Sequence, residues 1–143
     1  MEKQRASRDD YLHFTTLTTR WSDNDAYRHL NNVVYYSLFD TAVNEALIRA
    51  GLLDIERSSS IGLVVETGCR YFETLAFPDV VEAGMRVTAL GRTSVRYEIA
   101  LFRQGAGEAA AQGHFVHVYV DRETRRPVEL PLDLRSFLAR LSG

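Results

Sequence analysis

Hydrophobic positions between Val33 and Gly51 repeat as adjacent pairs four residues apart, with polar residues between the pairs. This spacing matches the 3.6-residue period of an α-helix and gives that helix a wide apolar face. Gly51 follows the last pair and suits the left-handed residue that commonly ends a helix. The pattern therefore predicts a helix of about 18 residues with one side in a core. The pairs are Val34/Tyr35, Leu38/Phe39, Ala42/Val43 and Ala46/Leu47.

One stretch before this helix and four after it have the composition of β-strands. In residues 80–90, apolar Val81, Ala83, Met85 and Val87 alternate with polar or small residues, as expected of a strand with one buried face. Turn-forming residues at 78–79 and 104–107 separate the later strands. We expect strands over residues 11–21, 61–75, 80–90, 94–103 and 109–120, and a short C-terminal helix over 131–141.

This order of elements predicts an α+β fold, because a run of strands beside one long helix favours segregated layers over a parallel α/β sheet. The simplest packing is a curved five-stranded antiparallel sheet wrapped around the long helix, whose N-terminus then lies at an edge or end of the sheet. Residues 1–10 are mostly polar and charged, so we expect a flexible tail there and a single domain over residues 11–143.

Composition narrows the class of protein. The chain has 143 residues, 45% hydrophobic and 25% charged, with a net charge of −2, which gives no basic field for nucleic acid. Cys69 is the single cysteine, so no intramolecular disulfide can form, and a reducing compartment is favoured. No signal-peptide pattern and no run long enough to span a membrane is present. We expect a cytoplasmic protein.

The chain concentrates polar chemistry directly before the long helix. Residues 22–32 contain two carboxylates, Asp23 and Asp25, then His29 and the amides Asn31 and Asn32. A helix N-terminus presents free N–H groups and a partial positive charge. A carboxylate beside it could attack a carbonyl, or direct water at one, while those N–H groups hold its oxygen. The same residues are also common in turns and helix caps, so both readings stay open.

The run Arg20-Trp21-Ser22-Asp23-Asn24-Asp25, followed by His29-Leu30-Asn31-Asn32 and Tyr35, resembles the signature of the hotdog-fold acyl-CoA thioesterases of the 4-hydroxybenzoyl-CoA thioesterase-like family. The element order resembles that family over residues 12–140. Arg28 departs from the motif, which usually has glycine before the histidine. The resemblance implies an acyl-CoA thioesterase on a hotdog fold.

The resemblance also assigns roles to residues of the site. It implies that Asp25 is the catalytic carboxylate, either as nucleophile or as general base, and that the backbone N–H near Asn32 holds the oxyanion. His29 is a candidate for the base or for a hydrogen-bonding strut. Neither a metal nor a cofactor is implied, because CoA is part of the substrate. Asp23 is interpreted as structural.

Other charged residues are candidates for binding or catalysis. Arg92 and Ser94 join two strands, and in relatives this region lies near the nucleotide, so they are the candidates for binding CoA. Asp40 and Glu45 are alternative helix carboxylates, but they fall on the polar side of the helix. Glu66 lies in a largely apolar strand and could face the site across a dimer.

The remaining candidates are two histidines and the cysteine. His114 and His117 are three residues apart in a predicted strand, so they should lie on opposite faces, which argues against a shared metal site. Cys69 has no evident partner that would activate it, and we expect a buried thiol.

The resemblance implies a homodimer joined through sheet edges, with dimers commonly paired into tetramers. Two alternatives remain: a hotdog hydratase acting on enoyl or hydroxyacyl thioesters, and a non-catalytic acyl-thioester binding protein. The acyl group is left open, since Tyr35, Tyr36 and Phe39 could line an aliphatic tunnel or stack on an aryl ring.

Overall fold

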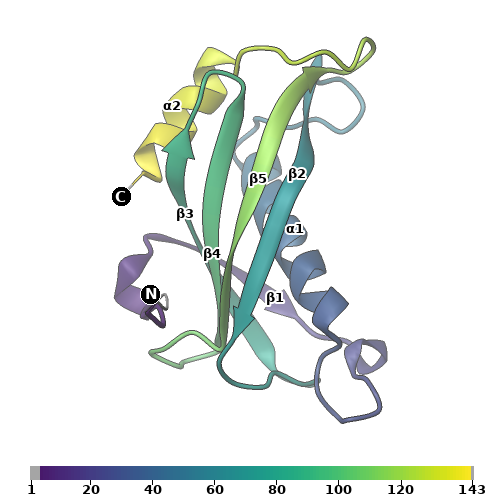
Figure 1. The fold of residues 1–143 in the computed structure, drawn as a ribbon, viewed down its shortest axis with the longest axis vertical. Helices are drawn as coiled ribbons and strands as arrows, with labels where there is room; N and C mark the ends of the chain where they lie inside the picture. The colour runs from purple at the N-terminus through teal and green to yellow at the C-terminus, as the bar shows by residue number, and fades with distance from the viewer. Residues whose placement is uncertain (1–3, 143) are drawn as a thin grey trace.

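The long helix lies against one face of a five-stranded sheet in the computed structural model, which describes residues 4–142 (Figure 1). The strands follow the order β1-β3-β4-β5-β2, and every neighbouring pair is antiparallel. The elements are η1 (Arg8–Asp10), β1 (His13–Thr18), η2 (Trp21–Asp23), α1 (Asn32–Arg49), β2 (Ser60–Tyr71), β3 (Val80–Leu90), β4 (Ser94–Arg103), β5 (Ala111–Asp121) and α2 (Leu132–Arg140). This confirms the predicted α+β, hotdog architecture.

The predicted elements are all present, with differences at their ends. Gly51, which follows the C-cap residue Ala50 of α1, has φ +74°, as expected of a residue that ends a helix. The first strand ends at Thr18, and the chain then turns through η2 instead of continuing to Trp21. In β2 the register shifts between Val64 and Glu66, so the β-bulge lies there and not at Gly62 or Gly68. Gly62 and Gly68 instead leave room for the rings of His117 and His114.

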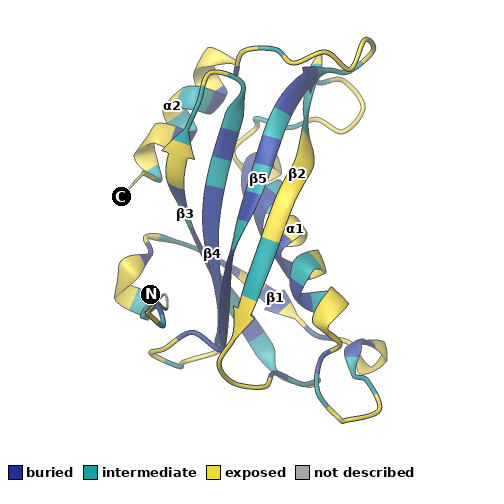
Figure 2. Ribbon diagram, in the orientation of Figure 1, coloured by how far each residue is buried: buried dark blue, intermediate teal, exposed yellow. Residues whose placement is uncertain are grey.

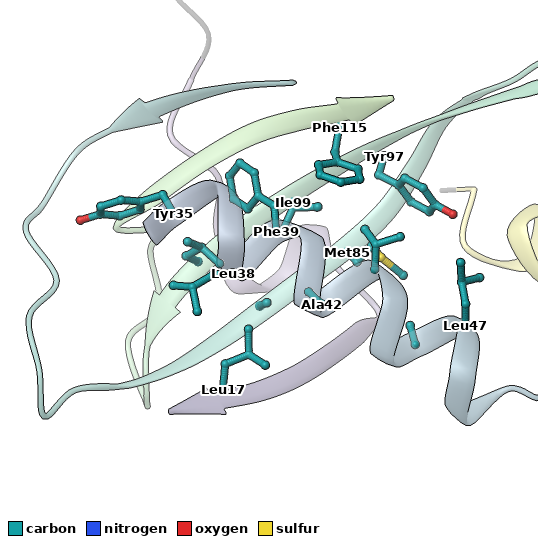
Figure 3. Close-up of a cluster of buried hydrophobic side chains, with 14 of the residues drawn as sticks. Leu17, Tyr35, Leu38, Phe39, Ala42, Leu47, Met85, Tyr97, Ile99 and Phe115 are labelled. Atoms are coloured by element: carbon teal, nitrogen blue, oxygen red, sulfur yellow. The ribbon is translucent and has the colours of Figure 1, made fainter. Parts of the chain in front are cut away.

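The core lies between α1 and the sheet (Figure 3). Phe39 and Val43 of α1 are fully buried, and Ile99 and Phe115 of the sheet face the same helix side. A Cβ on Gly113 would lie 2.8 Å from Phe39 Cε2 and would also clash with the Gly68 carbonyl oxygen. Glycine is therefore needed at position 113 for the helix to approach the sheet this closely.

The two histidines of β5 lie on opposite faces of the sheet, as predicted. His114 contacts the Glu66 carboxylate, 2.8 Å from Nε2 to Oε2. His117 is buried among the rings of Tyr97, Phe115 and Tyr119, and its Nδ1 has no hydrogen-bond partner among the described residues. Burial lowers the pKa of His117 to about 4, so this imidazole is neutral near pH 7.

The prediction of a flexible tail over residues 1–10 is wrong for residues 4–10, and residues 1–3 lie outside the described part. Ala6 is buried and Arg8–Asp10 form η1. Ala6 and Tyr11 pack with Ala100 and Phe102 in a second small core. Since side chains alternate along β4, this core lies on the face of the sheet opposite α1. The charged residues of this segment suggested a solvated tail, but Arg5 and Arg8 form ion pairs with Glu73 and Glu82, which fix the segment to the sheet.

Burial is uneven across the sheet. β4 is buried over most of its length, whereas β2, at one edge of the sheet, is exposed over residues 63–67 and at its last two residues (Figure 2). Leu63, Val64 and Val65 of β2 are all exposed. No helix among residues 4–142 is long and apolar enough to cross a membrane.

Candidate active site

The polar loop before α1 is anchored by Asp23. Its carboxylate accepts hydrogen bonds from the Arg20 backbone N–H (2.8 Å) and from the Arg20 guanidinium (3.1 and 3.3 Å). Its backbone oxygen accepts the Asn31 N–H at 2.9 Å. With its side chain almost fully buried, Asp23 ties the start of the loop to the start of the helix.

Asp25 begins a tight turn that returns to His29. The Asp25 N–H donates to the His29 carbonyl oxygen (2.9 Å), and the Arg28 N–H donates to the Asp25 carbonyl oxygen (3.1 Å). Asp25 Oδ1 accepts the Tyr27 N–H at 2.8 Å. Oδ2 lies 3.7 Å from His29 Nδ1, beyond hydrogen-bond distance. One carboxylate oxygen is therefore held by the turn, and the other accepts no hydrogen bond from residues 4–142.

Two other residues of this turn have defined geometry. Arg28 has φ +68°, a left-handed conformation that explains why glycine suits this position of the motif. His29 Nδ1 lies 3.2 Å from the Leu30 carbonyl oxygen. Because a carbonyl oxygen can only accept, this contact requires the proton on Nδ1 and leaves Nε2 of the neutral ring as an acceptor.

The helix begins with an unused N–H group. Asn31 is the N-cap, and its Oδ1 accepts the Val33 N–H at 3.0 Å. The Val34 N–H donates to the Asn31 carbonyl oxygen at 2.9 Å. The Asn32 N–H, at the first helical position, makes no hydrogen bond to any described residue. It is thus an available donor at the positive end of an 18-residue helix.

Asp25, His29 and Asn32 line one cavity of about 540 Å³. The opposite wall comes from the end of β2 and the residues after it, 71–74. Tyr35 and Tyr71 meet edge to face within this lining, with ring centroids 4.8 Å apart. The Tyr35 hydroxyl accepts the Leu75 N–H at 3.4 Å, and burial raises the pKa of that hydroxyl. The cavity therefore has a carboxylate and a helix start on one side and aromatic rings on the other.

The predicted CoA-binding residues lie elsewhere in the chain. Arg92 and Ser94 are at the β3–β4 turn, at the upper end of Figure 1, whereas the polar loop is at the lower end. Arg103, at the opposite end of β4, donates to the Thr74 carbonyl oxygen at 2.6 Å. The length of β4 thus separates Ser94 from the cavity by roughly 30 Å. Arg92 pairs instead with Glu129, 2.8 Å away.

The alternative carboxylates do not line the cavity either. Asp40 accepts a hydrogen bond from Asn44, and Glu45 pairs with Arg49, both along the exposed side of α1. Glu66 contacts His114 on the face of the sheet away from α1. Within residues 4–142, no three His, Cys, Asp or Glu side chains converge to hold a metal ion.

Sequence reasoning missed the wall formed by residues 71–74. These residues continue an apparent strand, and nothing in their own spacing indicates that the chain turns there. The wall is defined by contacts distant in sequence: the Leu30 N–H donates to the Leu75 carbonyl oxygen (2.8 Å), and Asn24 Oδ1 accepts the Phe77 N–H (2.9 Å). The one local signal was two adjacent aromatic residues, Tyr71 and Phe72, at the end of a strand.

Comparison with known proteins gives the following matches. A sequence model of the thioesterase-like superfamily matches residues 19–138. The PA5185 protein from Pseudomonas aeruginosa strain PAO1 is 54% identical, with a TM-score of 0.95 and 98% of each chain covered. The PA2801 protein from Pseudomonas aeruginosa, described as a candidate thioesterase, is 25% identical, with a TM-score of 0.81, covering 89% of this chain and 98% of its own.

A more distant structure shares the fold alone. The DHNA-CoA thioesterase from Staphylococcus aureus is 21% identical, with a TM-score of 0.74, covering 82% of this chain and 79% of its own. None of the curated proteins matches the chain in sequence.

Proposed function

This chain belongs to the thioesterase-like superfamily, and we propose that it hydrolyses an acyl-CoA to the free acid and CoA. The observation that carries this proposal is that Asp25 and Asn32 line the same cavity. One oxygen of the Asp25 carboxylate and the backbone N–H of Asn32 make no hydrogen bond with any residue that the structure describes. A nucleophile or base and an oxyanion donor are the two parts that acyl transfer requires.

Asp25 supplies the attack in either of two routes. In the first, Oδ2 attacks the thioester carbonyl carbon, the C–S bond breaks, CoA leaves as the thiolate, and water hydrolyses the resulting mixed anhydride. In the second, Oδ2 takes a proton from a water molecule that attacks the same carbon. Both routes need the free oxygen of Asp25, and both end with the acid and CoA.

The Asn32 N–H serves as the oxyanion donor. Negative charge develops on the carbonyl oxygen during attack, and a donor at a helix N-terminus stabilises that charge without reorganisation. The Asn31 cap favours this role because it uses the Val33 N–H and leaves that of Asn32 available. His29 is assigned a supporting role, in which its free Nε2 accepts a hydrogen bond from water or substrate.

The proposal also includes the association of subunits and the residues that would bind CoA. The exposed apolar edge of β2 supports a homodimer joined through that strand, with pairing of dimers as in the wider family. Arg92 and Ser94 would then contact CoA only from another subunit, because their own cavity is too distant. We propose a cytoplasmic enzyme without a metal or added cofactor.

Thiol release tests the function. The wild-type protein is incubated with short, medium, long and aromatic acyl-CoAs in the presence of a thiol-reactive dye. We expect release of free CoA from at least one substrate. A change in enoyl absorbance without thiol release would favour the hydratase. Saturable binding of acyl-CoA without either change would leave a binding protein.

A further inference from the structure

Residues 4–11 form a strap across the face of the sheet opposite α1; we call it the N-terminal strap. The buried Gln112 side chain binds its backbone twice: Oε1 accepts the Ala6 N–H at 2.5 Å, and Nε2 donates to the Gln4 carbonyl oxygen at 2.8 Å. The Ala109 N–H donates to the Ala6 carbonyl oxygen at 2.9 Å, and the Arg8 N–H donates to Gly107 at 2.8 Å. The strap is therefore fixed to β5 and to the segment that precedes it.

Arg5 of the strap reaches the wall of the cavity. Its Nε donates to the Ala109 carbonyl oxygen at 2.7 Å, and its Nη2 pairs with the Glu73 carboxylate. Its guanidinium carbon lies 5.7 Å from the centroid of the Phe72 ring. Phe72 and Glu73 both line the cavity, and both of their N–H groups donate to the Ala110 carbonyl oxygen. Arg5 thus contacts the side chains of two cavity-lining residues. It also binds the carbonyl of Ala109, next to the Ala110 carbonyl that accepts their N–H groups.

Leu75, the residue directly after this wall, is bonded to the catalytic side of the cavity. Leu75 accepts the Leu30 N–H and donates its own N–H to the Tyr35 hydroxyl. The wall therefore lies between the strap on one side and the polar loop and helix on the other. A displacement of residues 72–74 would change the width of the cavity without moving Asp25 within its own turn.

We propose that Arg5 is a positioning residue that sets where Phe72 and Glu73 stand and so tunes acyl-substrate binding. The inference rests on the proposed thioesterase activity. The family match begins at residue 19, so the strap lies outside the part of the chain that the family model covers. Because the strap lies outside the region that the family shares, it suits a role in binding a particular substrate rather than in the shared chemical step.

Arg8 provides a matched control on the same strap. It pairs with Glu82 at 2.7 Å, donates to the Ala106 carbonyl oxygen at 3.0 Å and lies over the rings of Phe14 and Phe102. These contacts are of the same kinds as those of Arg5: a bond to a carbonyl oxygen, an ion pair with a glutamate and a cation–π contact. None of the residues that Arg8 contacts lines the cavity.

Steady-state kinetics test the assignment. We expect Arg5→Ala to raise KM for the preferred acyl-CoA by about fivefold to tenfold while kcat stays within about twofold, the signature of lost substrate binding. Arg5→Lys should recover part of the KM, because it keeps the charge opposite Glu73. Arg8→Ala should leave both constants near wild type. An unchanged KM in Arg5→Ala, or an equal rise in Arg8→Ala, would overturn the proposal.

Amide hydrogen exchange gives a second readout that needs no turnover. Arg5→Ala should speed exchange at the Phe72 and Glu73 amides, and Arg8→Ala should not. Wild-type exchange at these amides in Arg5→Ala would overturn the role of the strap and leave the thioesterase proposal standing. Absence of thiol release by wild-type protein would overturn the proposed function, while the exchange result would still report on the strap.

Discussion

Replacing Arg28 with glycine should stabilise the protein. Arg28 has φ +68°, a region where a Cβ is unfavourable and glycine is not. Two backbone hydrogen bonds of the turn hold Arg28 in this conformation: the Arg28 N–H donates to the Asp25 carbonyl oxygen, and the Asp25 N–H donates to the His29 carbonyl oxygen. The Arg28 side chain is exposed and makes no hydrogen bond or ion pair with a described residue, so its removal loses no contact.

Two opposing terms set the size of the gain. A residue with a side chain costs about 1–2 kcal/mol in the left-handed region. Glycine has more freedom in the unfolded chain, which offsets about 0.4–1 kcal/mol of that gain. The net stabilisation is therefore about 0.5–1 kcal/mol, and for a chain of this length it raises Tm by roughly 2–4 °C.

Thermal and urea denaturation of Arg28→Gly and Arg28→Ala test the argument. Both variants lose the same guanidinium, but alanine keeps the Cβ in the left-handed conformation. Arg28→Gly should therefore be more stable than Arg28→Ala. Equal stability of the two variants would refute backbone strain as the cause. Arg125, with φ +63° in a different turn, offers a repeat of the comparison away from the cavity.

Two further changes test the core. The pKa of His117 falls from 6.5 in the unfolded chain to about 4 in the folded protein. The stability that depends on a neutral His117 is therefore fully present above pH 6.5 and is lost as the pH falls toward 4. Acidification to pH 4 should remove about 3 kcal/mol, and urea titrations should show a flatter pH dependence in His117→Phe; an unchanged profile would contradict buried neutrality. Gly113→Ala should cost at least about 2 kcal/mol, because Phe39 and the Gly68 backbone must move. Gly107→Ala, with open space around it, should be near neutral in the same melts, and equal losses would refute the close-approach argument.

The elements that could be predicted from sequence are those in which the spacing of apolar residues matches the face that the element buries. The bounds of β3 and β4 match the prediction, because alternation in each strand reflects one face turned toward α1. The long helix was evident because its apolar pairs meet the sheet at 3.6-residue spacing. Asp25, His29 and Asn32 could be grouped because they are close in sequence, and they line one cavity.

The features that could not be predicted depend on contacts between distant segments. Residues 4–10 look like a solvated tail until Arg5 and Arg8 find their carboxylate partners on the loop after β2 and on β3. The wall at residues 71–74 is held beside the polar loop and the helix by the next residue, Leu75, which bonds to Leu30 and Tyr35. Arg92 lies at the far end of β4 from its own cavity, so its proposed contact with CoA depends on a second subunit, which local sequence patterns do not reveal.

Replacement of Asp25 by asparagine tests whether the Asp25 carboxylate performs the hydrolysis. Asparagine keeps an oxygen that can accept the Tyr27 N–H, so the turn should survive, but it removes the nucleophile or base. We predict that kcat/KM for thiol release from the preferred acyl-CoA falls by about 10²–10⁴, with an unchanged Tm. Asp40→Asn, on the exposed side of α1, should retain wild-type turnover. Wild-type turnover in Asp25→Asn would contradict the account.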